Sequence, residues 1–386
     1  METRSAKRKK MAQIVENDAK AATDRISDLP DAVLHHILFL LPIKCVAQMS
    51  ILSKRWKFLW STFPDLDFRT LNPFEISSKN VKLLEFEKPR QPLDSSRMDF
   101  INQVLSIRDK HSDIRALEDL NLEKCYELEG LDISCAKLER IKLVKCFDGY
   151  SDKSWVKINA PKLEQLSWQH NAVTDMTIFE HSNLLDEVTV GFFILTRDNT
   201  SGKLQSAVDF LSGLSHARSL SLERQTIEIL SNNHLLIQPF YNLKYLELHT
   251  GFNKSNVPGL TCLFKSSPIL NTLILKIIHE YRIERKEWNR DLWDMTITEG
   301  EQYWESQIRT LESFLQHLKV VNIHGFLDYE NEVALAKFLL KHGKALEEMV
   351  LYTGHCNARD TLRRQKIRSQ MMGFSWASSN AKVAFQ

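Results

Sequence analysis

Between Asp24 and Phe68 the apolar side chains recur at helical spacing on more than one face. One face follows the i, i+3, i+4, i+7 pattern, with Leu34, Ile37, Leu38 and Leu41. A second stripe consists of Val33, Ile37 and Leu40. A single stripe is enough to hold a surface helix on a core. The second stripe therefore predicts a surface that a partner covers.

Two prolines set the limits of the first helix in this segment. Pro30 suits a first helical position, and Pro42 disfavours helix at the residue before it, so the pattern predicts a helix over about Asp31–Leu40. Two further short helices are expected, over Lys44–Ile51 and Lys54–Trp60. Three helices in about 45 residues form a marginal core, which favours a docking module over the alternative of a plain packing unit inside a larger domain.

The same segment resembles the plant form of the F-box. The matching residues are Leu29-Pro30, Ile37-Leu38, Leu41-Pro42, Val46, Leu52 to Trp56, Leu59-Trp60 and Pro64 to Phe68. The resemblance implies binding to a Skp-type adaptor and, through it, to the cullin and RING subunits of a ubiquitin ligase. It assigns adaptor binding to Leu29, Pro30, Leu34, Ile37, Leu38, Leu41, Pro42, Val46, Leu52, Ser53 and Trp56.

A second pattern, L-x-x-L-x-L with apolar substitutes, recurs along the rest of the chain. Its copies start at Leu117, Leu138, Leu163, Leu185, Leu243, Leu270, Leu318 and Leu346, with a weaker copy at Ala217. Most starts lie 21 to 32 residues apart, which is typical of leucine-rich repeats. Three copies add the next signature position, a turn residue, at Cys125, Cys146 and Asn171. The fold class expected is α/β: a short helical F-box followed by a repeat solenoid with a parallel β-sheet on its concave side.

Alternation within each repeat strand predicts which side chains point outward on the concave face. The leucine positions face inward, and the residues between them face out. Among the outward residues we expect Lys244, Tyr245, Glu247 and Asn271 to bind a target protein, because solenoids use such faces for binding. A merely solvated sheet surface is the alternative. The extra triplet Leu128-Leu131-Ile133 predicts an outer, convex strand.

The remaining segments complete a predicted domain plan. Residues 1–22 are expected to be a disordered basic tail, whose Lys7–Lys10 cluster is either a nuclear localisation signal or a solvated charge run. The F-box covers 23–68, a Pro-rich connector 69–97, and the repeats 98–309, with an amphipathic helix over Met98–His111 and a charged, Trp-bearing insertion over 278–309. Residues 310–356 contain Leu315, His317 to Lys319, Gly325-Phe326, Glu332-Val333, Leu339-Leu340 and Leu346. With these residues the segment resembles the FBD module of plant F-box proteins, and Ser313 stands where that family usually has Cys. A basic tail is expected over 357–386.

Composition excludes several functional classes. Lys plus Arg (51) balances Asp plus Glu (49), which argues against nucleic-acid binding. Neither a membrane span nor an export signal is expected, so the six cysteines are read as reduced thiols and the location as nucleus and/or cytoplasm. The sequence contains no known catalytic, phosphate-binding or metal-binding motif, so we expect no enzyme activity, metal or cofactor.

The two patterns together predict the substrate-recognition subunit of a Skp–cullin–F-box ubiquitin ligase, whose repeats bind an unidentified target protein. Two alternatives stay open. In one, the repeats bind a small hormone and act as a co-receptor in the same class of ligase. In the other, the protein is an interaction scaffold that works outside a ligase.

Overall fold

The computed structural model describes residues 26, 29–41, 43–49, 52–61, 65–67, 117–125, 128–149, 153–180, 183–194, 201–231, 237–252, 256–278, 297–326, 330–352, 365 and 368–386. The chain divides into two compact units, Met1–Phe63 and Pro64–Gln386. The predicted N-terminal tail, the connector and the helix at 98–111 lie outside the described residues.

The first unit contains the three short helices that the sequence predicts. They are α2 (Asp31–Phe39), α3 (Ile43–Met49) and α4 (Lys54–Ser61). Their shared core includes Leu34, Leu38 and Leu59, which have no exposed surface. The Arg55 guanidinium on α4 donates to the Leu29 carbonyl (2.5 Å) and to Asp31 Oδ1 (2.7 Å). These bonds fix the start of α2 against α4.

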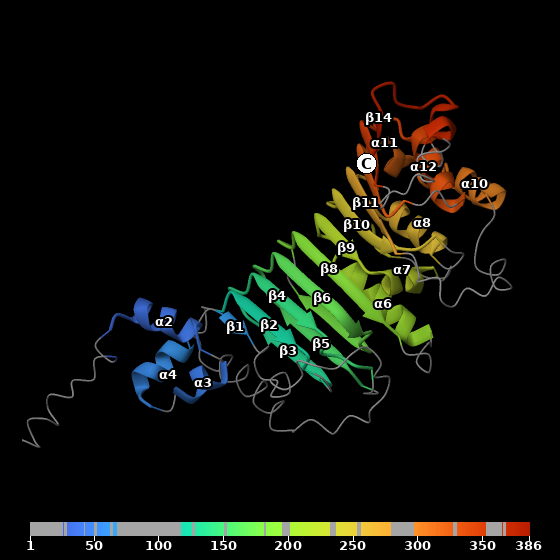
Figure 1. The fold of residues 1–386 in the computed structure, drawn as a ribbon. Helices are drawn as coiled ribbons and strands as arrows, with labels where there is room; N and C mark the ends of the chain where they lie inside the picture. Colours follow the sequence, from blue (N-terminus) through green and yellow to red (C-terminus); the bar gives the residue numbers. More distant parts are fainter. Residues whose placement is uncertain are drawn as a thin grey trace, which may run out of the picture. The chain divides into compact units, whose positions relative to one another are not determined.

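The second unit is built on a parallel sheet, which has eleven strands in the described part of the chain (Figure 1). Their order is β1-β2-β4-β6-β8-β9-β10-β11-β12-β13-β14. The strands are β1 (Asp65–Asp67), β2 (Asp119–Glu123), β4 (Arg140–Val144), β6 (Gln165–Ala172), β8 (Glu187–Phe193), β9 (Ser219–Leu222), β10 (Tyr245–Thr250), β11 (Thr272–Ile277), β12 (Val320–His324), β13 (Glu348–Tyr352) and β14 (Lys382–Phe385).

The strand register confirms the predicted repeats, because every leucine triplet contributes two residues to ladders that run across the sheet. One ladder includes Leu120, Ile141 and Leu166, and continues through Val188, Leu220, Leu246, Leu273, Val321 and Met349. The other joins Leu122 to Leu351 in the same way. All these side chains are buried. Their apolar contact holds each repeat to its neighbours.

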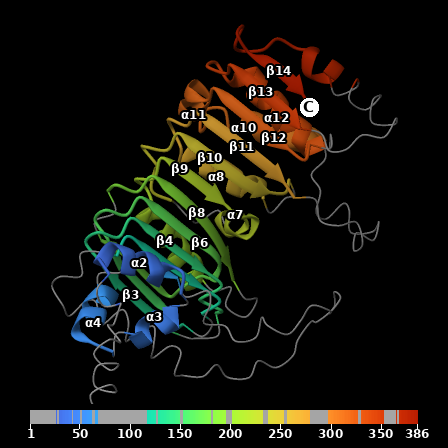
Figure 2. The same cartoon turned by 60° about the vertical axis from the view of Figure 1, so that its left-hand side comes forward.

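The convex layer changes from strands to helices along the chain. Its first part is a second parallel sheet of β3 (Gly130–Ser134), β5 (Trp155–Asn159) and β7 (Met176–Glu180), where β3 is the predicted outer strand. The rest is helical: α6 (Ser201–Gly213), α7 (Arg224–Leu230), α8 (Val257–Lys265), α10 (Ile297–Ser306), α11 (Glu312–His317) and α12 (Glu330–His342). Figure 1 shows these helices on one side of the sheet, and Figure 2 shows the same sheet turned by 60°.

Repeat length explains this change. The repeats that start at Leu117, Leu138 and Leu163 are 21 to 25 residues long and carry outer strands, while the later repeats are 26 to 48 residues long and carry helices. A strand rises about 3.3 Å per residue and a helix only about 1.5 Å. A helix therefore needs roughly twice as many residues to cross the same height of the solenoid.

Two of the predicted turn residues bond to neighbouring repeats. Cys146 follows β4, whereas Asn171 lies inside β6, beside an irregularity in the strand register. Asn171 is fully buried, and its Oδ1 accepts hydrogen bonds from the backbone N–H groups of Cys146 (2.7 Å) and Phe147 (3.1 Å) in the preceding repeat. Its Nδ2 donates to the Leu143 carbonyl (2.8 Å). The buried Cys146 thiol contacts the Leu122 carbonyl of the repeat before that, at 3.2 Å, and burial raises the pKa of this thiol. These two side chains thus join three repeats in series.

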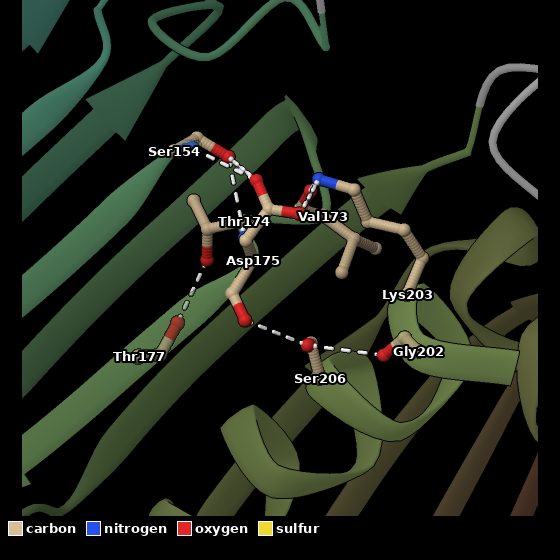
Figure 3. A network of polar contacts seen from close by, with 8 residues as sticks. All are labelled: Ser154, Val173, Thr174, Asp175, Thr177, Gly202, Lys203 and Ser206. Carbon is tan, nitrogen blue, oxygen red and sulfur yellow. Dashed lines mark hydrogen bonds and ion pairs between the residues drawn. The ribbon is translucent and has the colours of Figure 1, made fainter. Parts of the chain in front are cut away.

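A polar network joins the last outer strand to the first convex helix (Figure 3). Asp175, just before β7, accepts from the Lys203 ammonium of α6 at 2.8 Å and from the Ser154 N–H at 2.8 Å. The Ser206 hydroxyl on α6 donates to the Asp175 carbonyl at 2.9 Å. Burial tends to raise the pKa of Asp175, but the bonds from Lys203 and Ser154 outweigh it and lower that pKa. We call these four residues the junction network.

The structure adds secondary structure to three of the predicted segments. Residues 65–67 form β1, which pairs with β2, so the closing part of the F-box motif belongs to the sheet. The insertion at 278–309 includes α10, whose Trp304 is buried and packs near Phe264 and Phe338. The predicted C-terminal tail supplies β14, which pairs with β13 and ends the sheet.

Candidate functional site

The structure divides the predicted adaptor-binding residues into two groups. Leu34, Leu38, Val46 and Trp56 are at most 7% exposed, so they form the core that holds the three helices together. Their assignment to adaptor binding stays a prediction, because a helical apolar pattern does not reveal which stripe faces the core of the same unit. Leu29 is half-buried and Pro42 lies outside the described residues, while the exposed members are Pro30, Ile37, Leu41, Leu52 and Ser53.

An exposed apolar stripe runs along α2 and into the turn that follows it. It consists of Val33, Ile37, Leu40 and Leu41, which follow the i, i+4, i+7, i+8 pattern and have exposed fractions of 37% to 73%. We call it the docking stripe. It contains the second apolar stripe that the sequence predicts, and it adds Val33 and Leu40 to the candidate contact residues. Phe39 is also exposed, but it lies on another side of the helix. It follows Val33 by six residues, which turns it by about 240° around the helix axis from the start of the docking stripe.

The second candidate site is a groove of about 840 Å³ on the concave face of the parallel sheet, over β2 to β10. Two outward rows of side chains line it, and the strand register aligns each row. The first row is Asp119, Arg140, Gln165, Glu187, Ser219 and Tyr245. The second row is Asn121, Lys142, Ser167, Thr189, Ser221 and Glu247. We call this site the central groove.

Side-chain size gives the central groove its shape. Its floor carries the short hydroxyl side chains of Ser167, Thr189, Ser219 and Ser221 on three adjacent strands. Longer side chains stand at both ends, with Arg140 and Lys142 on β4 and Tyr245 and Glu247 on β10. The two rows therefore present mainly hydroxyl, amide and charged groups, and the aliphatic residues Leu120, Ile141, Leu166 and Val188 also belong to the lining.

Several charges in the groove are neutralised within the protein. Arg140 pairs with Asp119 on the adjacent strand, which raises the pKa of the guanidinium. Glu247 accepts from Lys276 Nζ (2.6 Å) and contacts His249 Nε2 (2.9 Å). Partial burial tends to raise the pKa of Glu247, but these two bonds outweigh it and lower that pKa. Burial and the nearby carboxylate of Glu247 raise the pKa of Tyr245.

The groove contains only part of the predicted target-binding set. Tyr245 and Glu247 line it. Lys244 and Asn271 lie just before β10 and β11, outside the lining, and their carbonyls accept backbone N–H groups of the next repeat. Sequence reasoning did not single out Lys142 and Glu187, although it placed both facing outward. The signal for the groove was the run of Ser and Thr at outward positions of successive repeats.

Two features are absent from the described residues. These residues contain no group of three or more His, Cys, Asp or Glu side chains arranged to hold a metal ion. Among their helices, none combines the length and the apolar character needed to cross a membrane.

Comparison with known proteins relates both sites to one family. Residues 26–67 match the F-box domain, and residues 111–383 match the LRR domain of the At1g61320/AtMIF1 type. Neither is a catalytic family. The second match includes the FBD-like segment, whose β12, α12 and β13 have the strand, helix and strand of a further repeat.

Individual relatives extend over nearly the whole chain. The Arabidopsis thaliana F-box/FBD/LRR-repeat protein At4g03220 is 38% identical over 100% of both chains. The F-box/LRR-repeat protein At3g59250 of the same plant is 24% identical over 93% of this chain and 97% of its own. An F-box followed by leucine-rich repeats is the domain arrangement of F-box substrate-receptor proteins. This chain belongs to the plant F-box/FBD/LRR-repeat family.

Proposed function

We propose that this protein is the substrate-recognition subunit of a Skp–cullin–F-box ubiquitin ligase. The docking stripe binds a Skp-type adaptor, which links the protein to the cullin and RING subunits. The repeat array holds a target protein. The chemistry belongs to the partner enzymes, and this chain raises the effective concentration of target lysines near the ubiquitin carrier.

The observation that carries the proposal is the docking stripe. Val33, Ile37, Leu40 and Leu41 leave apolar surface in water although the same short unit already has a core of its own. Exposing such a surface costs free energy, about 25 cal/mol for each Å² that a partner could cover. A contiguous apolar stripe on an otherwise folded helix is typical of a protein-binding surface.

Binding to a purified Skp-type adaptor tests this assignment. Ile37→Glu combined with Leu40→Glu places two carboxylates in the stripe, and truncating or charging central anchors typically costs about 2 kcal/mol or more. We expect at least a 30-fold loss of affinity for the adaptor. Both side chains are exposed, so circular dichroism and thermal unfolding should stay close to those of the unchanged protein.

Phe39→Glu is the matched control, because it places the same charge on the same helix at a more exposed position than Ile37 but on the opposite side. We expect its affinity to stay within about threefold of the original. A folded double variant that still binds the adaptor at full strength would contradict the docking stripe. Adaptor binding without recovery of cullin in pull-downs would instead favour a scaffold outside a ligase.

The lining of the central groove favours a protein target over the small hormone considered as an alternative. Sites for small molecules are lined mainly by apolar and aromatic side chains with a few polar groups. The central groove has four aliphatic residues in its lining, Leu120, Ile141, Leu166 and Val188, but its two outward rows contain one aromatic residue, Tyr245, among charged, amide and hydroxyl groups. Such a lining suits a polar peptide segment, which has many groups to hydrogen-bond.

We also propose a location in the nucleus and/or the cytoplasm. A fluorescent fusion of the intact chain, compared with one in which Lys7, Arg8, Lys9 and Lys10 are all changed to Ala, tests the role of the basic cluster. Loss of nuclear signal in the changed protein would support a localisation signal, and an unchanged distribution would mean a solvated charge run.

A further inference from the structure

Two charged side chains in the central groove have no ion-pair partner among the described residues. Lys142, in the second row on β4, has neither a salt bridge nor a side-chain hydrogen bond there. Glu187, in the first row on β8, accepts one hydrogen bond from the Gln165 amide (3.1 Å) and forms no salt bridge. The neighbouring charges differ from these two, because Asp119 pairs with Arg140 and Glu247 pairs with Lys276.

The strand register gives the separation of these two charges. Lys142 and Glu187 lie two strands apart, since β6 separates β4 from β8, and two residues apart along the strand direction. With about 4.8 Å between strands and about 3.3 Å per residue, their Cα atoms are roughly 12 Å apart. The outward residues of β6 between them are Ser167 and Gln165, and Thr189 adds a second hydroxyl group beside Ser167. The groove therefore has a cationic point and an anionic point with a hydrogen-bonding floor between.

We propose that the central groove binds an extended peptide segment with an acidic and a basic side chain four residues apart. The acidic side chain lies over Lys142 and the basic one over Glu187. In an extended chain, residues i and i+4 point to the same side and are about 13 Å apart, which matches the separation in the groove. The inference deepens the proposed function, on which its biological meaning rests, by giving the chemistry of the target segment.

Charge complementarity selects this occupant. A peptide with charges of one sign would meet repulsion at either Lys142 or Glu187, and an uncharged peptide would leave both unpaired. The groove crosses six adjacent strands, or about 24 Å, enough for roughly seven extended residues. The short hydroxyl side chains of Ser167, Thr189, Ser219 and Ser221 leave room for the peptide backbone.

A peptide array tests the proposal directly on the purified full-length chain. The probes are synthetic nonapeptides of alternating Thr and Val that contain one Glu and one Lys, in both orders and at separations of two to six residues. Binding should be strongest at a separation of four and in one of the two orders. Each partly exposed charge contact should contribute about threefold to fivefold in affinity.

Charge reversal provides the decisive comparison. Lys142→Glu and Glu187→Lys should each weaken the preferred peptide, and the double variant should prefer the opposite order of Glu and Lys. The matched control reverses Glu348 and Lys382, which form a facing pair on β13 and β14 on the same side of the sheet but outside the groove. The control should keep the original preference.

The array separates this proposal from the proposed function, because it needs neither adaptor nor ligase. If adaptor binding fails but the peptide preference follows the charge reversal, the groove proposal stands alone. If adaptor binding succeeds but the preference does not depend on separation, does not invert in the double variant, or changes equally in the control, the groove proposal is refuted. The groove proposal is also refuted if no charged peptide binds more tightly than an uncharged peptide of Thr and Val.

Discussion

Replacing Asn171 by Ala tests whether buried polar side chains hold neighbouring repeats together. The amide of Asn171 makes three hydrogen bonds to the backbone of the preceding repeat, at 2.7, 2.8 and 3.1 Å, and the side chain is fully buried. The substitution leaves two buried N–H groups and one buried carbonyl without this partner. Each orphaned group costs about 1–3 kcal/mol, and because water can enter the space left behind we expect a total of about 3 kcal/mol.

Two measurements follow this loss. The urea midpoint of unfolding should fall, and the N–H groups of Cys146 and Phe147 should exchange with solvent about 100-fold faster, since these groups lose their acceptor directly. Hydrogen-exchange mass spectrometry on peptides covering 140–149 resolves the second effect. Asn159→Ala is the control, because Asn159 lies half-buried at the end of β5, and its backbone oxygen, which the substitution keeps, accepts from the Cys135 N–H. Unchanged exchange at Cys146 and Phe147 in the Asn171 variant would refute the reasoning.

Three further outcomes can be checked. Leu246→Asp buries an unpaired carboxylate and should lower the free energy of unfolding by several kcal/mol. Tyr245→Ala, at the outward neighbour, should change it by about 1 kcal/mol or less. Urea titrations measure both, and a larger loss for Tyr245→Ala would contradict the strand register. The lowered pKa of Glu247 adds stability that is present above pH 4.5 and is lost as the pH falls through the folded-state pKa. In the Lys276→Met variant, the unfolding temperature should therefore decrease less as the pH falls below 4.5. If the decrease is the same as in the unchanged protein, the Glu247–Lys276 pair is not the cause of the acid sensitivity. Deleting residues 382–386 removes the strand that pairs with β13 and should promote aggregation in sedimentation experiments; a variant that stays monomeric would contradict a protective role for β14.

The repeat register could be predicted from sequence because it depends on local alternation. Each triplet buries two residues separated by one outward position, and this spacing allows a single orientation of the strand. The structure confirms this register. The position of Asn171 was predictable from its fixed distance to the triplet, but it lies inside β6, beside an irregularity in the register, and not in a turn after the strand.

The missed features depend on contacts that are distant in sequence. Leu66 looked like part of the F-box motif, yet the three residues of β1 acquire a strand partner 54 positions later, in β2. The four residues of β14 are too few to show a period, and β13 is what makes them a strand. On α2 the pattern showed two apolar stripes but could not tell which one faces the core, because α3 and α4 decide that. The central groove likewise depends on side-chain sizes compared across several strands.

The change from outer strands to outer helices also limits how the array can evolve. An outer strand occupies about 4.8 Å along the solenoid and a packed helix about 8–10 Å, so each class of repeat fits best beside its own kind. Duplicating or deleting a repeat within one class keeps its neighbours' spacing. The same event across the junction network would separate Asp175 from Lys203 and join layers of different width. Length variation among relatives is therefore expected within the strand-bearing or the helix-bearing segment, with the boundary between them inherited as a unit.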